Sequence, residues 1–444
     1  MVGDDVSVCS KELTVELGKA KKEITFLWGL NPYARNFSEV LLDHMNNLSK
    51  GEQAEIPFAR FLTVHRTVLD QVLQDLSKTY KKAKKDRSEK IKKPAGFPKK
   101  RKHSYCSSVR FQISCQKNKT YAQNWFAGFI FVPSIGLLKF RDNKSLPSTP
   151  PEMITVSRNT AGQFHVSFLD KDNVGASKVW RDLPEEKIEI NGKPQKVPSI
   201  DAVDVGLKTL GTTTKKEILR QRYTKKYAKN LRHANKSLAR KQKGSARYNK
   251  AKLTLGRVHL KISNSRDDYL KKEAKTVVKE NAILCLEDLT LGFMLQNRKL
   301  SKDAHDSSLG QFKTLIYQNA KKLGHLVIEC GRFDPSSKTC SCCGYYYKNL
   351  TLNERQWACP DCNTALLRDH NAAVNIRLMA LQKAINTLAA SGNDAWTLSP
   401  HRLHPKLVTF IERGGLTTML KAFKGLNVSQ SREALVLPQK TLEN

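Results

Sequence analysis

The chain has 444 residues, 39% of them hydrophobic, and Lys and Arg outnumber Asp and Glu by 77 to 41, which leaves a formal net charge of +36. This length supports two to four domains with hydrophobic cores, and the apolar content excludes a wholly disordered chain. So large a positive charge repels itself unless a polyanion neutralises it. Because no run of about 18 apolar residues is present to span a bilayer, nucleic acid is the expected partner and a membrane is not.

The N-terminal part of the chain predicts mainly helix. Residues 23–29 are apolar enough for a strand, which ends before Pro32. Apolar residues then recur at three- and four-residue steps over 40–48 and 61–76, as they do on the buried face of a helix. Residues 78–102 carry thirteen Lys and Arg against two acids and are broken by Pro and Gly, which predicts a helix end followed by a basic connector.

From 109 to 190 the hydrophobic period changes to two, which is typical of strands. Two of these strands, around Val156 and Val166, are joined by the sequence NTAG and predict a hairpin. We predict a small β-barrel or sandwich over 109–190. Residues 191–199 (NGKPQKVPS) predict a linker.

The remainder of the chain alternates strand and helix patterns. SIDAVDVGLKTLGTT predicts a strand that ends in a glycine-containing turn, and 282–286 and 323–329 predict two more strands. The last fifty residues have weak periodicity and are expected to be partly mobile. Two long helices are expected after the first of these strands, with apolar stripes at Leu219, Tyr223, Tyr227, Leu231, Ala234 and Leu238, and at Val258, Ile262, Tyr269, Leu270, Ala274 and Val277.

A strongly basic segment coincides with the first of these helices. Residues 215–252 hold fifteen Lys and Arg and one acid, Glu217, so one face can pack while the other meets phosphates. A merely solvated helix face is the alternative. The connector PKKRK (98–102) has the same composition, and a nuclear import signal is its alternative. The predicted nucleic-acid contacts are Arg222, Lys226, Lys229, Arg232, Lys236, Arg240, Lys99, Lys100, Arg101 and Lys102.

Five of the ten cysteines lie within 340–362, which is typical of reduced thiols around a metal inside a cell and not of a secreted disulfide scaffold. The pairs Cys340–Cys343 and Cys359–Cys362 each enclose two residues, so two tight turns can present four thiolates to one zinc ion in a closed, structural site. Four unrelated thiols are the alternative. Cys342 breaks the spacing and is expected to be a spare thiol. Around this ribbon, either a nucleic-acid face or packing around the metal explains Arg355, Trp357 and Tyr345–Tyr347.

Three acids lie at the expected ends of strands or at the expected start of a helix. Asp204 follows apolar residues in AVDVG, Glu287 ends the apolar run AILCL, and Asp369 begins RDHNAAVNI, where an amphipathic helix starts. Two-metal phosphodiester hydrolysis needs carboxylates that converge on Mg²⁺ ions, and an acid beside an apolar strand is costly unless it is paired or metal-bound. The alternatives are a helix N-cap for Asp369 and replacement of the other two by Asp201 or Asp288.

The motifs AVDVGLKTLGT, LEDLTL, TCSCCG…CPDC and RDHNAAVNI, in this order, resemble the TnpB family of transposon-encoded nucleases and the related miniature type V CRISPR effectors. The resemblance is strong over about 200–378 and moderate over 60–175. It implies that Asp204, Glu287 and Asp369 are the three catalytic acids of an RNase H-like (RuvC) nuclease and bind two Mg²⁺ ions. It also implies that the four paired cysteines bind structural zinc. Leu367 stands where the family usually has an acid, and residues 1–20 and the last fifty match no part of it.

The resemblance implies an α+β multidomain RNA-guided DNA endonuclease that binds a structured guide RNA, recognises a short motif beside its target and acts as a monomer or a homodimer on one guide RNA. Its alternatives are a catalytically silent RNA-guided regulator and a transposase-type DNA strand transferase. Because the N-terminus lacks a secretory pattern, we expect a cytoplasmic, nucleoid-associated protein, or a nuclear one in a eukaryote. The implied divisions are an N-terminal segment with the first barrel strand (1–31), a helical recognition lobe (32–108), a wedge-like β-barrel (109–190), a linker (191–199), the first part of the nuclease (200–330), the zinc ribbon (331–363), the last nuclease helix (364–390) and a C-terminal tail (391–444).

Overall fold

The computed structural model describes only part of the chain, and the chain divides into two compact units. Residues 1–178 and 237–257 form the first unit, and residues 179–236 and 258–444 form the second. No helix among the described residues is long and apolar enough to cross a membrane. The described residues are 8–12, 66–89, 91, 94–98, 108–112, 125, 127–132, 136–139, 150–169, 182–190, 192–288, 292, 296–298, 300–351, 354–391 and 403–434.

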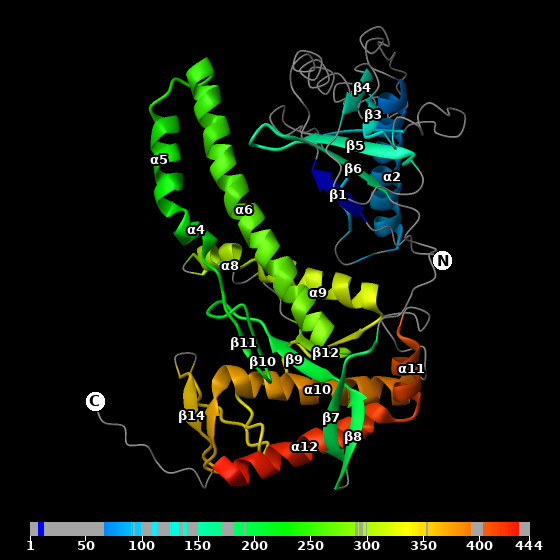
Figure 1. The fold of residues 1–444 in the computed structure, drawn as a ribbon, viewed down its shortest axis with the longest axis vertical. Coiled ribbons are helices and arrows are strands. Elements are labelled where there is room, and N and C mark those ends of the chain that lie inside the picture. The colour runs from blue at the N-terminus through cyan, green and yellow to red at the C-terminus, as the bar shows by residue number, and fades with distance from the viewer. Residues whose placement is uncertain are drawn as a thin grey trace. The chain divides into compact units, whose positions relative to one another are not determined.

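The described residues of the N-terminal part of the first unit form a helix and two antiparallel sheets (Figure 1). A four-stranded sheet has the order β1-β6-β5-β2, and β3 pairs with β4. Closure of these strands into a barrel stays a prediction, as does the strand at 23–29, which lies outside the described residues together with the helix at 40–48 and Lys99–Lys102. The elements are β1 (Val8–Glu12), α2 (Arg66–Ser88), β2 (Ser108–Gln112), β3 (Phe129–Val132), β4 (Gly136–Lys139), β5 (Met153–Arg158) and β6 (Phe164–Leu169).

The predicted hairpin is confirmed, with Val156 of β5 opposite Val166 of β6. At its turn, the Asn159 side-chain oxygen accepts hydrogen bonds from the backbone N–H groups of Ala161 and Gln163, both at 3.0 Å, which closes the loop locally. Gly256 passes so close to this turn that a Cβ atom there would lie 2.2 Å from the Thr160 carbonyl oxygen. A side chain at position 256 would therefore force the two segments apart.

The predicted linker is wrong. Residues Lys193–Pro198 form strand β8, which pairs antiparallel with β7 (Glu185–Ile190). Gly192 turns the chain between them at a φ of +75°. Val197 is buried together with Ile188 and Ile190 in a core of the second unit. These apolar residues alternate with charged ones, and only the opposite strand shows which of them face inward.

The second unit is built on a five-stranded sheet of order β11-β10-β9-β12-β13. Strands β9, β12 and β13 run parallel, while β10 is antiparallel to both of its neighbours. The central strands are buried along almost their whole length, as expected for parallel strands covered on both faces. The strands are β9 (Ile200–Asp204), β10 (Gly211–Thr213), β11 (Glu217–Ile218), β12 (Ile283–Glu287) and β13 (Leu326–Cys330).

Helices cover both faces of this sheet. Ile200, Ile283 and Ile328 face a core that they share with α10, α11 and α12, and α10 packs directly against β9, β12 and β13 (Figure 1). Val203 and Leu284 face the opposite core, which is covered by α6 and α9. The helices of this unit are α4 (Tyr223–Lys226), α5 (Ala228–Ala239), α6 (Ala246–Glu280), α8 (Ser301–Ser307), α9 (Leu309–Leu323), α10 (Arg368–Ser391), α11 (Pro405–Glu412) and α12 (Gly415–Ala434), of which α5 and α6 extend into the first unit.

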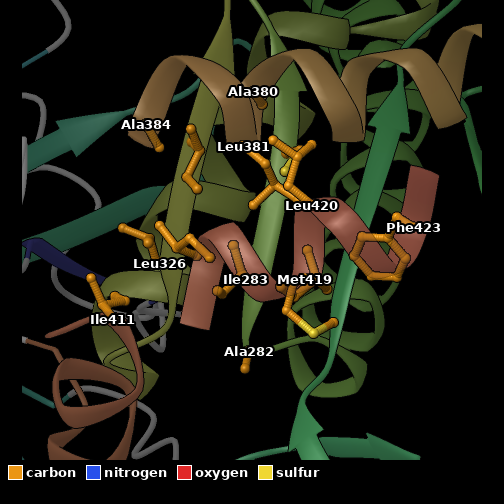
Figure 2. Packing of buried hydrophobic residues seen from close by; sticks show 14 of the residues in the cluster. Ala282, Ile283, Leu326, Ala380, Leu381, Ala384, Ile411, Met419, Leu420 and Phe423 are labelled. Atoms are coloured by element: carbon orange, nitrogen blue, oxygen red, sulfur yellow. The ribbon is translucent and has the colours of Figure 1, made fainter. Parts of the chain in front are cut away.

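The C-terminal region is not the weakly structured tail that its sequence predicts. Helices α11 and α12 bury Ile411, Met419 and Leu420 against α10 and the sheet, and Figure 2 shows these side chains gathered with Ile283. Phe423 lies under the guanidinium of Arg377, whose central carbon is 3.8 Å from the ring centroid. This region folds because α10 offers it an apolar face, which local periodicity does not reveal.

The first predicted apolar stripe is only partly correct. The segment breaks into α4 and α5 at Tyr227, Ala234 is buried, and Leu219 precedes both helices with 63% of its surface exposed. The second stripe is confirmed in α6, where Ile262, Leu270 and Val277 are buried.

Candidate active site and zinc ribbon

Three elements of the second unit bring the predicted acids to one end of the sheet. Asp204 is the last residue of β9 and Glu287 the last of β12, two parallel neighbours. Alternation along each strand places both acids on the face that Ala202 and Cys285 present to α10. Asp369 is the second residue of α10 itself. The carboxyl ends of two parallel strands and the start of the helix that crosses them therefore converge.

The electrostatics of Asp204 report this convergence. Burial, together with the negative charges of Glu287 and Asp369, raises the pKa of Asp204 from 3.8 to about 7, while Arg368 and Arg355 oppose the rise. Burial also raises the pKa of Glu287, against the effect of Lys313. A carboxylate whose ionisation two further carboxylates disfavour belongs to a donor set that a divalent cation relieves. The residues present thus fit Mg²⁺ by charge and by ligand type.

Asp369 already has a cationic partner. The Arg355 guanidinium donates from Nη1 to both carboxylate oxygens of Asp369, at 2.9 and 3.0 Å, and Arg368 Nε lies 3.5 Å from Oδ1. Because α10 begins at Arg368, Asp369 lies inside the first turn and not at the N-cap position, so the N-cap interpretation is wrong. Arg355 supplies the positive charge that this acid needs in the protein without metal.

The two neighbouring acids have other partners. Asp201 is buried, and its Oδ1 accepts hydrogen bonds from the Thr214 hydroxyl at 2.7 Å and from the Thr214 N–H at 3.0 Å. Asp288 forms an exposed ion pair with Arg332 at 3.0 Å. Asp201 thus ties β9 to the turn after β10, and Asp288 lies at the surface. Neither acid is among those that raise the pKa of Asp204.

The end of β12 is held from the opposite face of the sheet. Lys313 of α9 donates to the Glu287 carbonyl oxygen at 3.0 Å and forms an ion pair with Glu329 of β13 at 2.6 Å. The Tyr317 hydroxyl donates to the same Glu329 carboxylate at 2.5 Å. Two residues of one helix face therefore bind two adjacent strands where Glu287 leaves the sheet.

The pKa of Asp204 predicts how the stability of the metal-free protein depends on pH. The folded chain holds a proton up to about pH 7 that the unfolded chain releases near 3.8. This proton stabilises the folded chain by at most about 4 kcal/mol. The full contribution to the free energy of unfolding is present below pH 3.8, and it is lost as the pH rises to about 7. Asp204→Asn should remove this loss, so that its melting temperature in Mg²⁺-free buffer falls less between pH 5.5 and pH 8 than that of the wild type.

The control for this measurement is Asp268→Asn. Asp268 is an exposed acid of α6 that pairs with Lys272, so it makes the same change in charge without a buried carboxylate. Its melting temperature should follow the wild-type pH dependence. Equal pH dependence of Asp204→Asn and the wild type would contradict the buried, like-charged setting of Asp204.

The four paired cysteines form a compact thiol cluster. Their sulfur atoms all lie within 4.8 Å of one another, and among the described Cys, His, Asp and Glu residues no other group meets that criterion. The Cys340–Cys362 and Cys343–Cys359 sulfur pairs are 3.7 and 3.5 Å apart. Four sulfurs bound at 2.3 Å around zinc are roughly 3.8 Å apart. The donor chemistry and the spacing fit a structural Zn²⁺ ion.

The aromatic residues of the ribbon divide between packing and exposure. Trp357 of β14 (Gln356–Ala358) is buried and stacks on Tyr347 at 5.7 Å between ring centroids. Cys342 packs against this small core but does not belong to the thiol cluster. Tyr345 and Tyr346 are exposed, as is Leu367 at the end of β15 (Ala365–Leu367). Packing around the metal thus explains Trp357 and leaves two tyrosines at the surface.

The basic residues of α4 and α5 are exposed. In the described part of the chain, no acid forms an ion pair with Lys229, Arg232 or Lys236, and the same holds for the other three predicted contacts Arg222, Lys226 and Arg240. The start of α4 is anchored by buried Asp306, which accepts hydrogen bonds from the Thr224 hydroxyl at 2.5 Å and from Arg266 at 3.0 Å. The helices α4 and α5 therefore carry a basic surface whose charges face solvent.

The contacts of several residues around the acids escaped sequence reasoning. Arg355, Lys313 and the buried pair Asn371 and Asn375 all contact the acids, their backbone or their supporting loops. Only the asparagines carried a local signal, since they are spaced by four residues on the helix whose second residue is Asp369. Arg355 and Lys313 are each isolated from other Lys and Arg residues in the sequence, and nothing local pairs either of them with an acid on a distant element.

Two family models match the second half of the chain. Residues 187–298 match the model described as "Probable transposase", and residues 310–376 match the model described as "Cas12f1-like, TNB domain". The first match contains two of the acids, and the second contains the third acid and the four cysteines.

Similar proteins are known from bacteria. A Streptomyces pristinaespiralis protein named "Putative RNA-guided DNA endonuclease" is 32% identical over 241 residues, which cover 54% of this chain and 56% of that protein. An Escherichia coli (strain K12) protein named "Putative RNA-guided DNA endonuclease InsQ" is 23% identical over 325 residues, 69% of this chain and 73% of that protein. The chain thus spans just over half the length of the first relative. A solved structure of a Cas12f1–sgRNA–target DNA complex has a TM-score of 0.46 at 12% identity and covers 81% of this chain and 83% of that one.

Proposed function

We propose that this protein, a member of the TnpB family, is an RNA-guided DNA endonuclease whose nuclease site consists of Asp204, Glu287 and Asp369. The observation that carries the proposal is the placement of these acids at the carboxyl ends of the parallel strands β9 and β12 and at the start of α10, which packs across both strands. Relatives that carry the name RNA-guided DNA endonuclease support it by sequence. The guide RNA and the target DNA are the proposed partners, bound by one copy or two copies of the chain.

The nuclease part is proposed to be RNase H-like. Its support is the strand order β11-β10-β9-β12-β13, with β10 antiparallel and the last three strands parallel, and a helix crossing the face on which the acids end. Asp204, Glu287 and Asp369 would hold Mg²⁺, which supplies a nucleophilic water and stabilises the charge on the leaving oxygen. Arg355 pairs with Asp369, and its guanidinium would be placed to contact a phosphate bound beside that acid.

The basic helices are proposed to bind the guide or its duplex with the target by the phosphates. Lys229, Arg232 and Lys236 are exposed, and their charge is not matched by acids on the same helix. Such contacts release counterions and therefore weaken as salt rises. They recognise the shape of an A-form duplex, while base pairing reads the sequence. The connector Lys99–Lys102 is proposed as a second phosphate contact on composition alone.

Salt dependence distinguishes bound from merely solvated charges. Replacing Lys229, Arg232 and Lys236 together by Gln should lower RNA affinity and reduce the slope of log K against log salt by about 2–3, at roughly 0.7–0.9 per lost phosphate contact. Filter binding from 50 to 300 mM salt measures that slope. The matched control replaces Lys187, Lys193 and Lys196, three exposed lysines of the β7–β8 hairpin, and should keep the wild-type slope. An unchanged slope in the helix variant would identify a solvated face.

The test of the proposed function is cleavage by the copurified ribonucleoprotein. The RNA that copurifies with the chain is sequenced, and a DNA carrying the complementary target beside randomised flanks is incubated with Mg²⁺. Cutting that depends on the RNA and on complementarity is expected. A single discrete RNA with binding and no cutting would favour a silent regulator, and joining of DNA ends without RNA would favour a strand transferase.

A further inference from the structure

We infer that Asn371 and Asn375 are positioning residues that clamp the loop before the first zinc knuckle onto α10 and thereby hold Asp369 where it binds metal. This inference rests on the proposed function, because it assigns to these residues an effect on the metal that the nuclease site would use. Neither asparagine was among the predicted site residues, and neither contacts an acid of the site through its side chain in the described contacts.

The clamp consists of four hydrogen bonds from two buried side chains. The Asn371 side-chain oxygen accepts from the Ser341 N–H at 2.9 Å, and its amide group donates to the Thr339 carbonyl oxygen at 2.8 Å. Asn375 donates to the carbonyl oxygens of Ser336 and Thr339, at 2.7 and 2.6 Å. Asn371 is 1% exposed and Asn375 is 3% exposed. One face of α10 therefore satisfies the backbone of residues 336–341, which contain Cys340.

Buried asparagines are unfavourable inside a helix unless their amide groups form hydrogen bonds. Asn is an unfavourable residue inside a helix, and a buried amide without a partner costs about 1–3 kcal/mol. Apolar residues would pack at either position, because the neighbouring residues Ala372 and Ala373 are buried and Ile376 belongs to the hydrophobic core. Two amides spaced by one helical turn fit a role in holding a loop that has no strand partner.

The clamped loop joins two parts of the proposed site. It follows β13, whose last residue Cys330 lies opposite Glu287 in the sheet, and it leads into the zinc cluster. On the far side of the ribbon, the Arg368 N–H donates to the Arg355 carbonyl oxygen at 2.8 Å, and the Arg355 side chain binds Asp369. The start of α10 is thus attached to both halves of the ribbon. Release of one attachment would let Asp369 move relative to Glu287.

The alternative is that the asparagines only stabilise the ribbon. The two roles differ in what a substitution changes. A clamp that positions Asp369 affects the affinity of the acids for a divalent metal, whereas a clamp that serves ribbon stability affects zinc retention and melting temperature alone. Residues that orient metal ligands typically change metal affinity 10–100-fold when they are replaced.

The experiment compares Asn371→Ala and Asn375→Ala with Asn386→Ala, all in the full ribonucleoprotein. Asn386 is an exposed residue of the same helix, and its side chain accepts from Gln382 at 3.0 Å. The concentration of free Mn²⁺ measured by electron paramagnetic resonance gives the Mn²⁺ dissociation constant without reference to cutting. Bound zinc is counted with a chromogenic chelator, and cleavage is measured against both Mn²⁺ and DNA concentration.

We expect both clamp variants to keep one zinc per chain, to bind Mn²⁺ at least about 10-fold more weakly and to need correspondingly more Mn²⁺ for half-maximal cleavage, with the KM for DNA unchanged. Asn386→Ala should match the wild type. If Asn371→Ala loses zinc, Asn375→Ala decides, because its bonds reach only residues before Cys340. Unchanged Mn²⁺ affinity, or zinc loss from both variants, would overturn the inference. A wild-type complex that binds Mn²⁺ but does not cut would instead overturn the proposed function.

Discussion

Asp204→Asn should abolish DNA cleavage while the protein keeps its guide RNA. The substitution keeps the shape of the side chain and removes the negative charge that Asp204 contributes beside Glu287 and Asp369. A residue that only orients a metal ligand costs 10–100-fold when replaced, so loss of a ligand is expected to cost more than about 100-fold. Single-turnover cleavage with Mg²⁺ measures the rate, and the copurified RNA is quantified from the same preparation.

Asp288→Asn is the matched control for this prediction. Asp288 is the residue next to Glu287, but it pairs with Arg332 at the surface and does not contribute to the pKa of Asp204. Its cleavage rate should stay within a few-fold of the wild type. Undiminished cutting by Asp204→Asn would refute the assignment, and a large loss in Asp288→Asn alone would move the metal site to the strand-end neighbour.

Cys359→Ser should release the zinc and unfold the ribbon. The Cys359 sulfur is fully buried, and a serine hydroxyl there is a poor ligand for zinc in a thiolate site. Structural zinc contributes about 10–16 kcal/mol of folding free energy in isolated zinc-finger peptides, so the remaining thiols cannot compensate. Since Arg355 and the clamped loop belong to the ribbon, cleavage should fall together with the zinc content.

Cys342→Ser tests the same ligand set by replacing a cysteine that is not expected to bind zinc. Cys342 lies between the two ligands of the first knuckle and packs against the ribbon core without joining the cluster. This variant should keep one zinc per chain and the wild-type cleavage rate, as measured by elemental analysis and by the cleavage assay. Zinc loss in Cys342→Ser with retention in Cys359→Ser would show that the ligands are wrongly assigned.

Local patterns carried much of the prediction. The cysteine spacing predicted a thiol cluster that the structure confirms, because two residues between cysteines already determine where the sulfurs point. The hairpin around Val156 and the strands of Asp204 and Glu287 followed from the period of their apolar residues. The predicted linker failed because β8 is an edge strand rich in polar residues, which has no period of its own.

The sequence by itself determined the four clustered thiols, since closely spaced pairs of cysteines are recognisable without their partners, and it indicated three candidate acids, two of them at the ends of apolar runs. Only the tertiary structure decided which residues surround them: Arg355 on Asp369, Lys313 under Glu287, and two asparagines on the loop before the zinc knuckle. It also decided that the C-terminal helices pack on α10. These contacts join elements that are distant in the chain, and their residues have no spacing in common, so the free energy that selects them arises only when the sheet and α10 meet.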